Sequence, residues 1–234
     1  MEKSDLPEYL QNGVVILEKA VSCLPEEEQA QARESLHNIY ARCAGGITDK
    51  LTRLYSSDFM EESLSTEIMR AQRQVKRQKV ESIPLTIFYF DINCLKDIND
   101  TYSHDHGNEF LKTAADYFRS VFQRGTDIIG RFLKGDEFLV IAPFTPKNDA
   151  DTLYERLQKE MITQLYQVIE DDKVIAEIPL RFATGVYTYE ITQEDVTLPP
   201  EIIRNEMVAS AEKRMYLVKT SMKGKDPYLK KHSR

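Results

Sequence analysis

Two short apolar segments, residues 127–132 and 137–142, stand on either side of Lys134-Gly135-Asp136. Apolar segments joined by a tight polar turn are typical of a β-hairpin. Two adjacent carboxylates, Asp136 and Glu137, lead directly into the second segment. Solvated hairpin tips favour Asn-Gly or Asp-Gly pairs instead, so paired charge at this turn indicates that something binds there.

The rest of the chain alternates helical and strand patterns. We expect helices at 6–44 (restarted at Pro25), 58–79, 107–122, 148–165 and 200–222, a buried strand at 85–92, and a second hairpin formed by 174–178 and 180–189. Helices alternating with hairpin-linked strands predict an α+β domain with a mixed, mainly antiparallel sheet. A basic run on the helix at 58–79 is expected to form a solvated face; it contains Arg70, Arg73, Lys76, Arg77 and Lys79.

Charge and composition narrow the class of partner. The chain has 234 residues, 41% of them hydrophobic, which is enough for one globular domain plus an extension. Its net charge of −7 and pI of about 5.3 argue against a nucleic-acid-binding surface, which usually carries a basic stripe. A nucleotide substrate stays compatible with this charge, because Mg²⁺ and a few lysines neutralise a triphosphate locally.

The sequence also indicates a compartment. Cys23, Cys43 and Cys94 have no CxxC or Cys/His ligand spacing, so we expect buried free thiols in a reducing environment. The stretch MEKSDLPEYLQNG is acidic and lacks an apolar core, which is unlike a signal peptide. The apolar runs are too short to span a bilayer. These patterns predict a cytoplasmic protein without a membrane span.

A third carboxylate, Asp91, follows the hydrophobic run from Ile87 to Phe90 near the end of the predicted strand. If that strand neighbours the one that begins at Glu137, Asp91 meets Asp136 and Glu137 at one edge of the sheet. Such a trio of hard oxygen ligands suits Mg²⁺ and phosphates. For any single one of these residues, a surface-turn carboxylate is the alternative.

Five motifs occur in a fixed order. They are Asp49-Lys-Leu-Thr-Arg-Leu-Tyr55; the run from Asp91 to Asp100 followed by Tyr102, His104 and Gly107; Gly135-Asp-Glu-Phe138; Arg181-Phe-Ala-Thr-Gly-Val186; and the run from Ala211 to Lys219. They resemble the DxLTxLxNR opening, the DxDxFKxINDxxGHxxGD block, the signature, the SxG strand and the ADxxLYxAK helix of the GGDEF family. The resemblance spans Asp49 to about Lys225.

This resemblance implies a fold and an activity. The fold is a ferredoxin-like, polymerase-palm-type nucleotidyl cyclase domain at 48–225, with a central, mainly antiparallel sheet flanked by helices. An N-terminal helical segment at 1–47, regulatory or dimerising, precedes it, and a tail at 226–234 follows. The implied enzyme is a diguanylate cyclase, which condenses two GTP molecules into cyclic di-GMP and two pyrophosphates across a homodimer.

The resemblance also assigns the metal and catalytic residues. Asp91, the backbone carbonyl of Ile92, and Asp136 would hold two Mg²⁺ (or Mn²⁺) ions per active site. Glu137 would share that task or help to deprotonate the attacking 3′-hydroxyl. Two metal ions then activate the nucleophile and stabilise charge on the α-phosphate and its leaving pyrophosphate.

Substrate and product contacts carry over in the same way. Lys96 and Lys219 would clamp the β- and γ-phosphates as point charges. Asn99 would read the guanine edge, and the other implied substrate contacts are Asn108, His104 and Gly135. Arg124-Gly-Thr-Asp127 matches the RxxD motif at which cyclic di-GMP inhibits family members, and a guanidinium fork suits a guanine Hoogsteen edge.

Several positions depart from the family pattern. Lys134 replaces the first signature glycine, and the turn is longer by one residue. Glycine lets backbone approach phosphate closely, whereas a lysine either blocks the nucleotide or adds a phosphate contact. Asn108 stands where the family has a guanine-reading Asp, and an amide offers one acceptor and one donor in place of two acceptors. This substitution could therefore weaken the selectivity for guanine and allow some binding of adenine.

Three functions remain open at this point. The first is an active diguanylate cyclase. The second is a catalytically degenerate GGDEF domain that binds cyclic di-GMP at Arg124 and Asp127, or GTP at the old site, and acts as an effector. The third is a scaffold whose N-terminal helices carry the function through dimerisation or a protein partner. Retention of Asp91 with Asp136 and Glu137 argues against the third.

Overall fold

The computed structural model describes residues 20–25, 28–29, 32, 47–132, 135–161 and 163–222. The elements are α3 (Ser57–Gln78), β1 (Ser82–Ile92), α4 (Leu95–Thr101), α5 (His104–Val121), β2 (Ile128–Phe132), β3 (Glu137–Pro143), α6 (Lys147–Met161), β4 (Leu165–Glu170), β5 (Lys173–Pro179), β6 (Phe182–Thr192), the 3₁₀ turn η2 (Glu194–Thr197) and α7 (Pro200–Met222). Most of the predicted helical segment at 1–47, and the tail at 226–234, lie outside the described residues.

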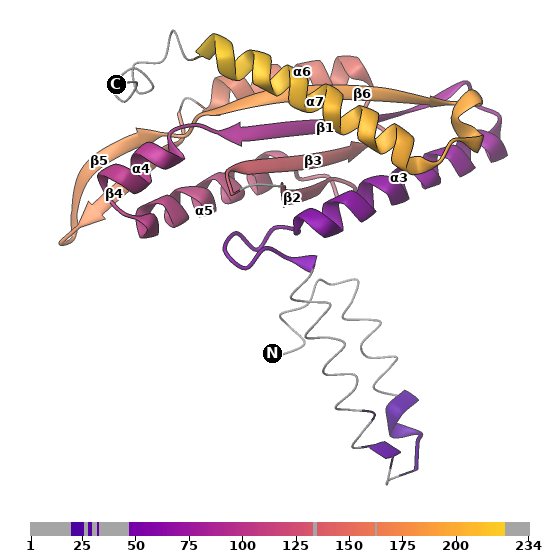
Figure 1. Cartoon of the computed structure of the whole chain (residues 1–234), viewed down its shortest axis with the longest axis horizontal. Helices are drawn as coiled ribbons and strands as arrows, with labels where there is room; N and C mark the ends of the chain where they lie inside the picture. Colours follow the sequence, from indigo (N-terminus) through magenta and orange to yellow (C-terminus); the bar gives the residue numbers. More distant parts are fainter. Residues whose placement is uncertain are drawn as a thin grey trace.

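The main sheet has four strands in the order β2-β3-β1-β6, and every neighbouring pair is antiparallel (Figure 1). The central strand β1 pairs with β6 over eleven residues and with β3 over seven. Its β-branched and aromatic side chains suit a strand that is covered on both faces. The predicted α+β domain with an antiparallel sheet flanked by helices is therefore confirmed.

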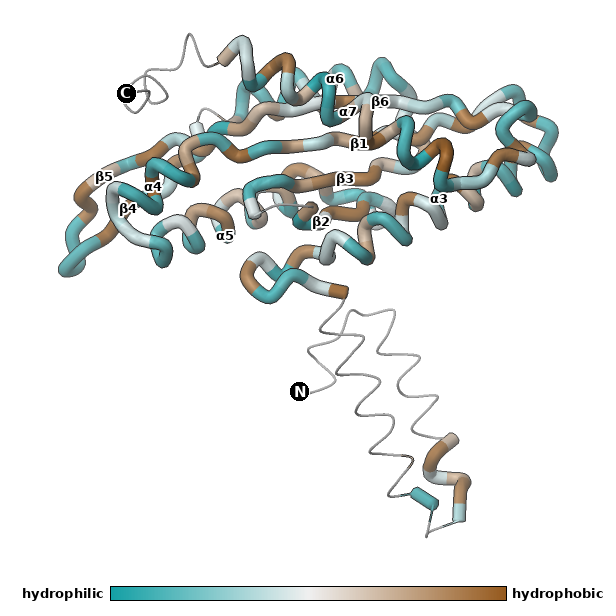
Figure 2. The backbone as a smooth tube through the Cα atoms, in the orientation of Figure 1, coloured by the Kyte–Doolittle hydropathy of each residue, from teal (hydrophilic) through white to brown (hydrophobic). Residues whose placement is uncertain are grey.

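Alternating side chains of β1 pack into two separate hydrophobic layers, one on each face of the sheet. Phe88 and Phe90 pack with residues of α5 and α6, whereas Ile87 and Tyr89 pack with residues of α3 and α7. In the first layer the Phe90 and Phe118 rings lie 4.5 Å apart. Burying one such side chain contributes about 1.5–3 kcal/mol. Figure 2 shows hydrophobic colour along β3 and hydrophilic stretches on the helices around it.

Side-chain caps mark the helix starts. Ser56 caps α3 by accepting a hydrogen bond from the Phe59 amide, and Ser103 caps α5 by accepting one from the His106 amide. At the C-terminal end of α3, Lys79 adopts a left-handed conformation and its amide donates to the Val75 carbonyl. The predicted helix at 58–79 is confirmed to within a residue, and the basic run on it is exposed as expected.

The prediction for 148–189 was wrong in two respects. The helix α6 ends at Met161, and Leu165 begins a strand, β4, that the sequence analysis missed. Leu157, Met161 and Leu165 recur at helical spacing, so periodicity alone extended the helix. The predicted hairpin between 174–178 and 180–189 was also wrong. Strand β5 pairs with β4 through a two-residue turn at Asp171 and Asp172, both at positive φ, and β6 joins the main sheet beside β1.

The closing helix α7 approaches the sheet closely at one point. A Cβ on Gly185 of β6 would lie 1.9 Å from the Ala211 carbonyl oxygen of α7, so only glycine fits there. This close approach explains the glycine of the Thr184-Gly185 motif, because it lets α7 pack directly against β6. In the described part of the chain, no helix is long and apolar enough to cross a membrane.

Candidate active site

The strand register brings the three predicted carboxylates to one sheet edge. Asp91, at the end of β1, lies directly opposite Glu137, at the start of β3. The Ile92 amide donates a hydrogen bond of 2.9 Å to the carbonyl of Asp136. The two strands are therefore neighbours, as the predicted trio of carboxylates required.

A lysine from the far end of the sequence reaches the same edge. Lys219 on α7 places its Nζ 2.6 Å from Oδ2 of Asp91. The Asp91 side chain is 7% exposed and that of Lys219 is 32% exposed, so the pair is partly shielded from water. A buried carboxylate requires such a partner. The structure thus joins two predicted site residues that are 128 positions apart.

A buried tyrosine beside this edge was missed by the sequence analysis. Tyr89 lies two residues before Asp91 on β1 and therefore faces the same layer. Burial raises the pKa of the Tyr89 phenol, and the carboxylates of Glu137, Glu212 and Asp91 raise it further. The two-residue spacing from Asp91 is the signal that marks Tyr89 as a neighbour of the site.

The donor set fits a hard divalent cation. Asp91 and Glu137 offer carboxylate oxygens from opposed strand positions, and Asp136 follows the turn beside them. Within the described residues, no three Asp, Glu, His or Cys side chains already converge on one point. Mg²⁺ is usually held by one or two carboxylates together with water and substrate phosphates, so the opposed carboxylates of Asp91 and Glu137 could supply the protein ligands of such a site.

The predicted base-reading residues meet at the start of α5. A Cβ on Gly107 would lie 1.9 Å from Oδ1 of Asn99, so glycine makes room for the Asn99 side chain there. Asn108, the next residue, is exposed on α5, as is His104 at its first turn. Lys96 lies exposed on the short helix α4, which the sequence analysis did not predict. The structure therefore places Asn99 against the start of α5, beside the residue that precedes Asn108.

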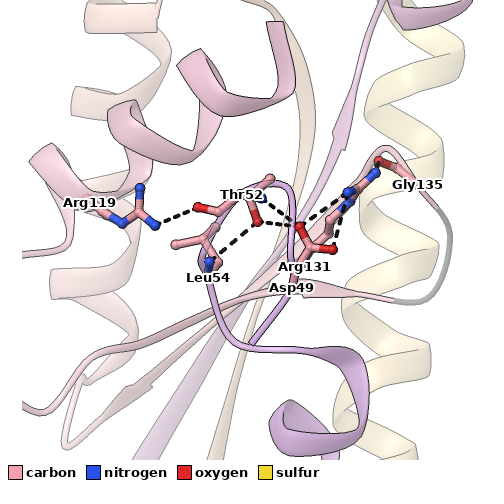
Figure 3. Close-up of polar contacts among 6 residues, drawn as sticks. All are labelled: Asp49, Thr52, Leu54, Arg119, Arg131 and Gly135. Carbon is pink, nitrogen blue, oxygen red and sulfur yellow. Dashed lines mark hydrogen bonds and ion pairs between the residues drawn. The ribbon is translucent and has the colours of Figure 1, made fainter. Parts of the chain in front are cut away.

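Arg131 ties the signature turn to the segment before α3 (Figure 3). Its guanidinium donates to the Gly135 carbonyl at 2.5 and 3.0 Å, and Nη1 lies 3.2 Å from Oδ1 of Asp49. Asp49 also accepts hydrogen bonds from the backbone amide and hydroxyl of Thr52. Arg119 of α5 donates to the Thr52 carbonyl at 2.6 Å. We call Asp49, Thr52, Arg119 and Arg131 the turn brace.

The turn brace affects the ionisation of Asp49. Burial alone would raise its pKa, but the hydrogen bonds from Thr52 and the charge of Arg131 lower the pKa below the ordinary value of 3.8. Gly135 thus has a defined support, whereas the departure at Lys134 lies outside the described residues. The sequence analysis matched Asp49 to a motif without foreseeing its partner 82 residues away.

A second polar site lies at the other end of β2. Arg124 contacts Asp127 at 2.7 Å, and its Nη2 donates to the Thr145 hydroxyl at 2.6 Å. The Asp127 side chain is 2% exposed, whereas that of Arg124 is 50% exposed. Arg156 of α6, which the sequence analysis missed, lines the same pocket. We call Arg124, Asp127, Thr145 and Arg156 the arginine pocket.

Comparison with known proteins gives the family. The model of the family described as "Diguanylate cyclase, GGDEF domain" matches residues 46–225. Response regulator PleD of Caulobacter vibrioides is 35% identical over 112 residues, which are 48% of this chain and 23% of PleD. The chain spans less than a third of the length of the first curated relatives that it matches.

Two solved structures share the fold. The coiled coil and GGDEF domain of DgcB from Caulobacter crescentus, in complex with c-di-GMP, aligns with a TM-score of 0.65 at 17% identity, covering 83% of this chain and 90% of that one. Diguanylate cyclase SiaD of Pseudomonas aeruginosa, in complex with its activator SiaC, aligns with a TM-score of 0.57 at 22% identity, covering 92% of this chain and 72% of that one.

Proposed function

The chain belongs to the diguanylate cyclase GGDEF domain family, and on that premise we propose that it condenses two GTP molecules into cyclic di-GMP with release of two pyrophosphates. The observation that carries the proposal is the edge where Asp91 lies opposite Glu137 and within 2.6 Å of Lys219. A domain that had lost phosphoryl chemistry would have no need to keep buried charge there, because buried charge is costly.

In this proposal Asp91, Asp136 and the Ile92 carbonyl hold two Mg²⁺ or Mn²⁺ ions. The ions, when bound, supply activation of the 3′-hydroxyl and neutralisation of charge on the phosphates. Glu137 shares their coordination or accepts the proton of the attacking hydroxyl. The new bond joins the 3′-oxygen of one nucleotide to the α-phosphorus of the other, while the bond from that phosphorus to pyrophosphate breaks.

Lys219 changes partner when substrate binds. Its ammonium group contacts Asp91, and cations bound to that carboxylate would release it toward the γ-phosphate. Lys96 is exposed on α4 and is free to meet the β-phosphate. Asn99 and Asn108 read the guanine, and His104 and the Gly135 backbone complete the substrate contacts. Substrate binding would then replace the Lys219–Asp91 pair by a Lys219–phosphate pair and a cation–Asp91 pair, so that no charge is left without a partner.

Two chains are needed for one product. Each domain holds one GTP, so the two nucleotides react only when two domains face each other in a homodimer. Holding both nucleotides in line supplies a large part of the rate enhancement. We propose that a protein partner bound to residues 1–47 regulates that encounter, because the SiaD structure contains an activator protein. The proposed compartment is the cytoplasm, where GTP is available.

The arginine pocket is the proposed site for product inhibition. Arg124 presents a planar guanidinium at 50% exposure beside the buried carboxylate of Asp127, and Arg156 adds a second fork. Planar forks suit both guanine edges and phosphates. Cyclic di-GMP offers both groups, which favours it as the ligand.

The second candidate is an effector that binds cyclic di-GMP without making nucleotide product. The arginine pocket favours it, because its charges are in place independently of the signature turn. Lys134 and Asn108, the departures at the substrate site, favour it too.

One assay separates the two candidates. Purified chain, shown to be dimeric, is incubated with GTP and Mg²⁺ and the products are identified by mass spectrometry. Cyclic di-GMP supports the cyclase, and its absence at high enzyme concentration leaves the effector. A parallel reaction with GTP and ATP tests Asn108: a mixed or adenine product would show relaxed base reading, and a pure guanine product would show that the amide suffices.

A further inference from the structure

Tyr89 is a buried phenol at the candidate site to which the proposed reaction gives no task. It lies two residues before Asp91 on β1 and is 0% exposed. Among the described residues, no group meets hydrogen-bond geometry with its hydroxyl. A buried donor without an acceptor costs stability. Its persistence at a chemical site indicates an acceptor that arrives in another state of the protein.

The groups around this hydroxyl are carboxylates. Glu137 acts on it most strongly, through its charge and a marginal side-chain hydrogen bond, and Glu212 and Asp91 act on it through their charge alone. Among acidic neighbours a protonated phenol donates a hydrogen bond. The acceptor that the hydroxyl lacks is therefore a carboxylate, and Glu137 is the first candidate.

The tyrosine ring is fixed by its packing, and Glu137 lies at a less buried position of the neighbouring strand. The Tyr89 ring meets the Phe132 ring edge-to-face at 5.7 Å, and Tyr89 pairs with Leu139 across the sheet. Glu137 is only half-buried at the first position of β3.

We propose that Tyr89 is a positioning residue that donates a hydrogen bond to the Glu137 carboxylate when that carboxylate turns to hold a divalent cation. The proposal rests on the proposed function, in which Glu137 shares the cation with Asp91 and Asp136. The hydrogen bond holds one carboxylate oxygen in place and orients the other toward the cation. Partners of this kind orient metal ligands and raise metal affinity.

The test uses Tyr89→Phe, which removes only the hydroxyl. Mn²⁺ is titrated calorimetrically into the full chain bound to a non-hydrolysable GTP analogue. We expect Tyr89→Phe to bind Mn²⁺ about 10- to 100-fold more weakly, with a melting temperature equal to or above that of the wild type, because the substitution removes an unfilled buried donor.

The matched control is Tyr117→Phe. Tyr117 is also buried, but it lies in the other layer and donates to the Leu157 carbonyl at 3.3 Å. Its variant is expected to keep wild-type Mn²⁺ affinity and to lose a little thermal stability. An equal loss of Mn²⁺ affinity in both variants would indicate a general packing effect and would overturn the proposal.

Other outcomes also decide the matter. Unchanged Mn²⁺ affinity in Tyr89→Phe overturns the positioning role, as does an unfolded variant, since the hydroxyl would then be structural. The proposal is also overturned if the wild-type chain binds no Mn²⁺, or if Asp91→Asn leaves its Mn²⁺ binding unchanged. If the wild type binds Mn²⁺ and Tyr89→Phe weakens that binding, but no cyclic di-GMP forms, the cyclase activity fails while the positioning role stands.

Discussion

The candidate active site and the arginine pocket lie at opposite ends of the same strand, β2, yet they are assembled differently. The active-site edge joins residues from β1, β3 and α7, and its buried carboxylate Asp91 is held by Lys219. The arginine pocket is built around one local pair, Arg124 and Asp127, three residues apart. In the proposed mechanism the first site exchanges partners when substrate binds, whereas the second already presents its guanidinium to solvent.

This difference indicates that the two sites can be lost separately. Cation and nucleotide binding at the active-site edge depends on the long-range packing that brings α7 to β1. Ligand binding at the arginine pocket depends on Arg124, which is tied to Asp127 and Thr145 whether or not the signature turn is competent. A cyclase and an effector of this family would then differ at the active-site end of β2, while both keep the arginine pocket at the other end.

The largest expected effect comes from Asp91→Asn. Loss of a carboxylate that stabilises the cations removes several kcal/mol of transition-state stabilisation, which corresponds to about a 10³-fold lower rate of cyclic di-GMP formation. Rates are measured by chromatography of products over time. The exposed Asp151→Asn change on α6 serves as control and should leave the rate intact. If Asp91→Asn also abolished cyclic di-GMP binding, the two sites would not be separable.

The next largest effect is expected for Arg124→Ala at the other end of β2. The guanidinium offers charged hydrogen bonds worth about 1.5–3 kcal/mol each, so cyclic di-GMP affinity should fall by about 10- to 100-fold in calorimetry. Initial rates measured before product accumulates should match the wild type. Lys159→Ala, an exposed change on α6 outside the pocket, is the control. Unchanged affinity in Arg124→Ala would remove the proposed inhibitory site.

A smaller loss is expected for Arg156→Ala, whose side chain lines the pocket without contacting Asp127 or Thr145 in the described contacts. One charged contact to the ligand corresponds to about a tenfold change in affinity. Arg156→Lys should recover only part of it, because a lysine lacks the planar fork. Full recovery by lysine would indicate that the pocket recognises charge alone.

The smallest effect concerns the turn brace that supports the active-site end. Asp49→Asn removes the charge that faces Arg131, and we expect about 1–2 kcal/mol lower unfolding free energy at neutral pH. The pKa of Asp49 is lower in the folded state than in the unfolded chain, so its contribution is complete above about pH 4 and falls as the pH drops through the folded value.

Urea unfolding at several pH values tests this expectation. The stability difference between wild type and Asp49→Asn should narrow below pH 4 and stay constant above it. A difference that widened in acid would contradict the role of the Asp49 carboxylate. Cyclic di-GMP affinity should be unchanged throughout, since the turn brace does not reach the arginine pocket.

The sequence predicted the parts of this molecule that depend on local pattern. The strand ending at Asp91, the hairpin around Gly135 and the helix at 200–222 each follow from residues that are close in sequence. The strand β4 was not recognised, because Leu165 continues a helical spacing and only the packing of the hairpin decides between the two. Boundaries of this kind are set by tertiary contacts.

The candidate site was predictable where charge is unusual for its position, as at Asp136 and Glu137. The partners were not predictable in the same way. Arg131 meets Asp49, and Arg156 joins Arg124, through a fold that places distant residues together. Tyr89 looks like an ordinary core aromatic until the register sets it opposite Leu139, one diagonal step from Glu137. Such pairs depend on geometry that one sequence does not contain.

The most direct test of the central claim is the rate of cyclic di-GMP formation from GTP and Mg²⁺ by the dimeric chain, measured beside Asp136→Asn. The proposed cyclase predicts steady product formation by the wild type and its loss in the variant, with both proteins folded and binding cyclic di-GMP equally. Absence of product from the wild type, or equal rates for the two proteins, would contradict catalysis at the signature turn.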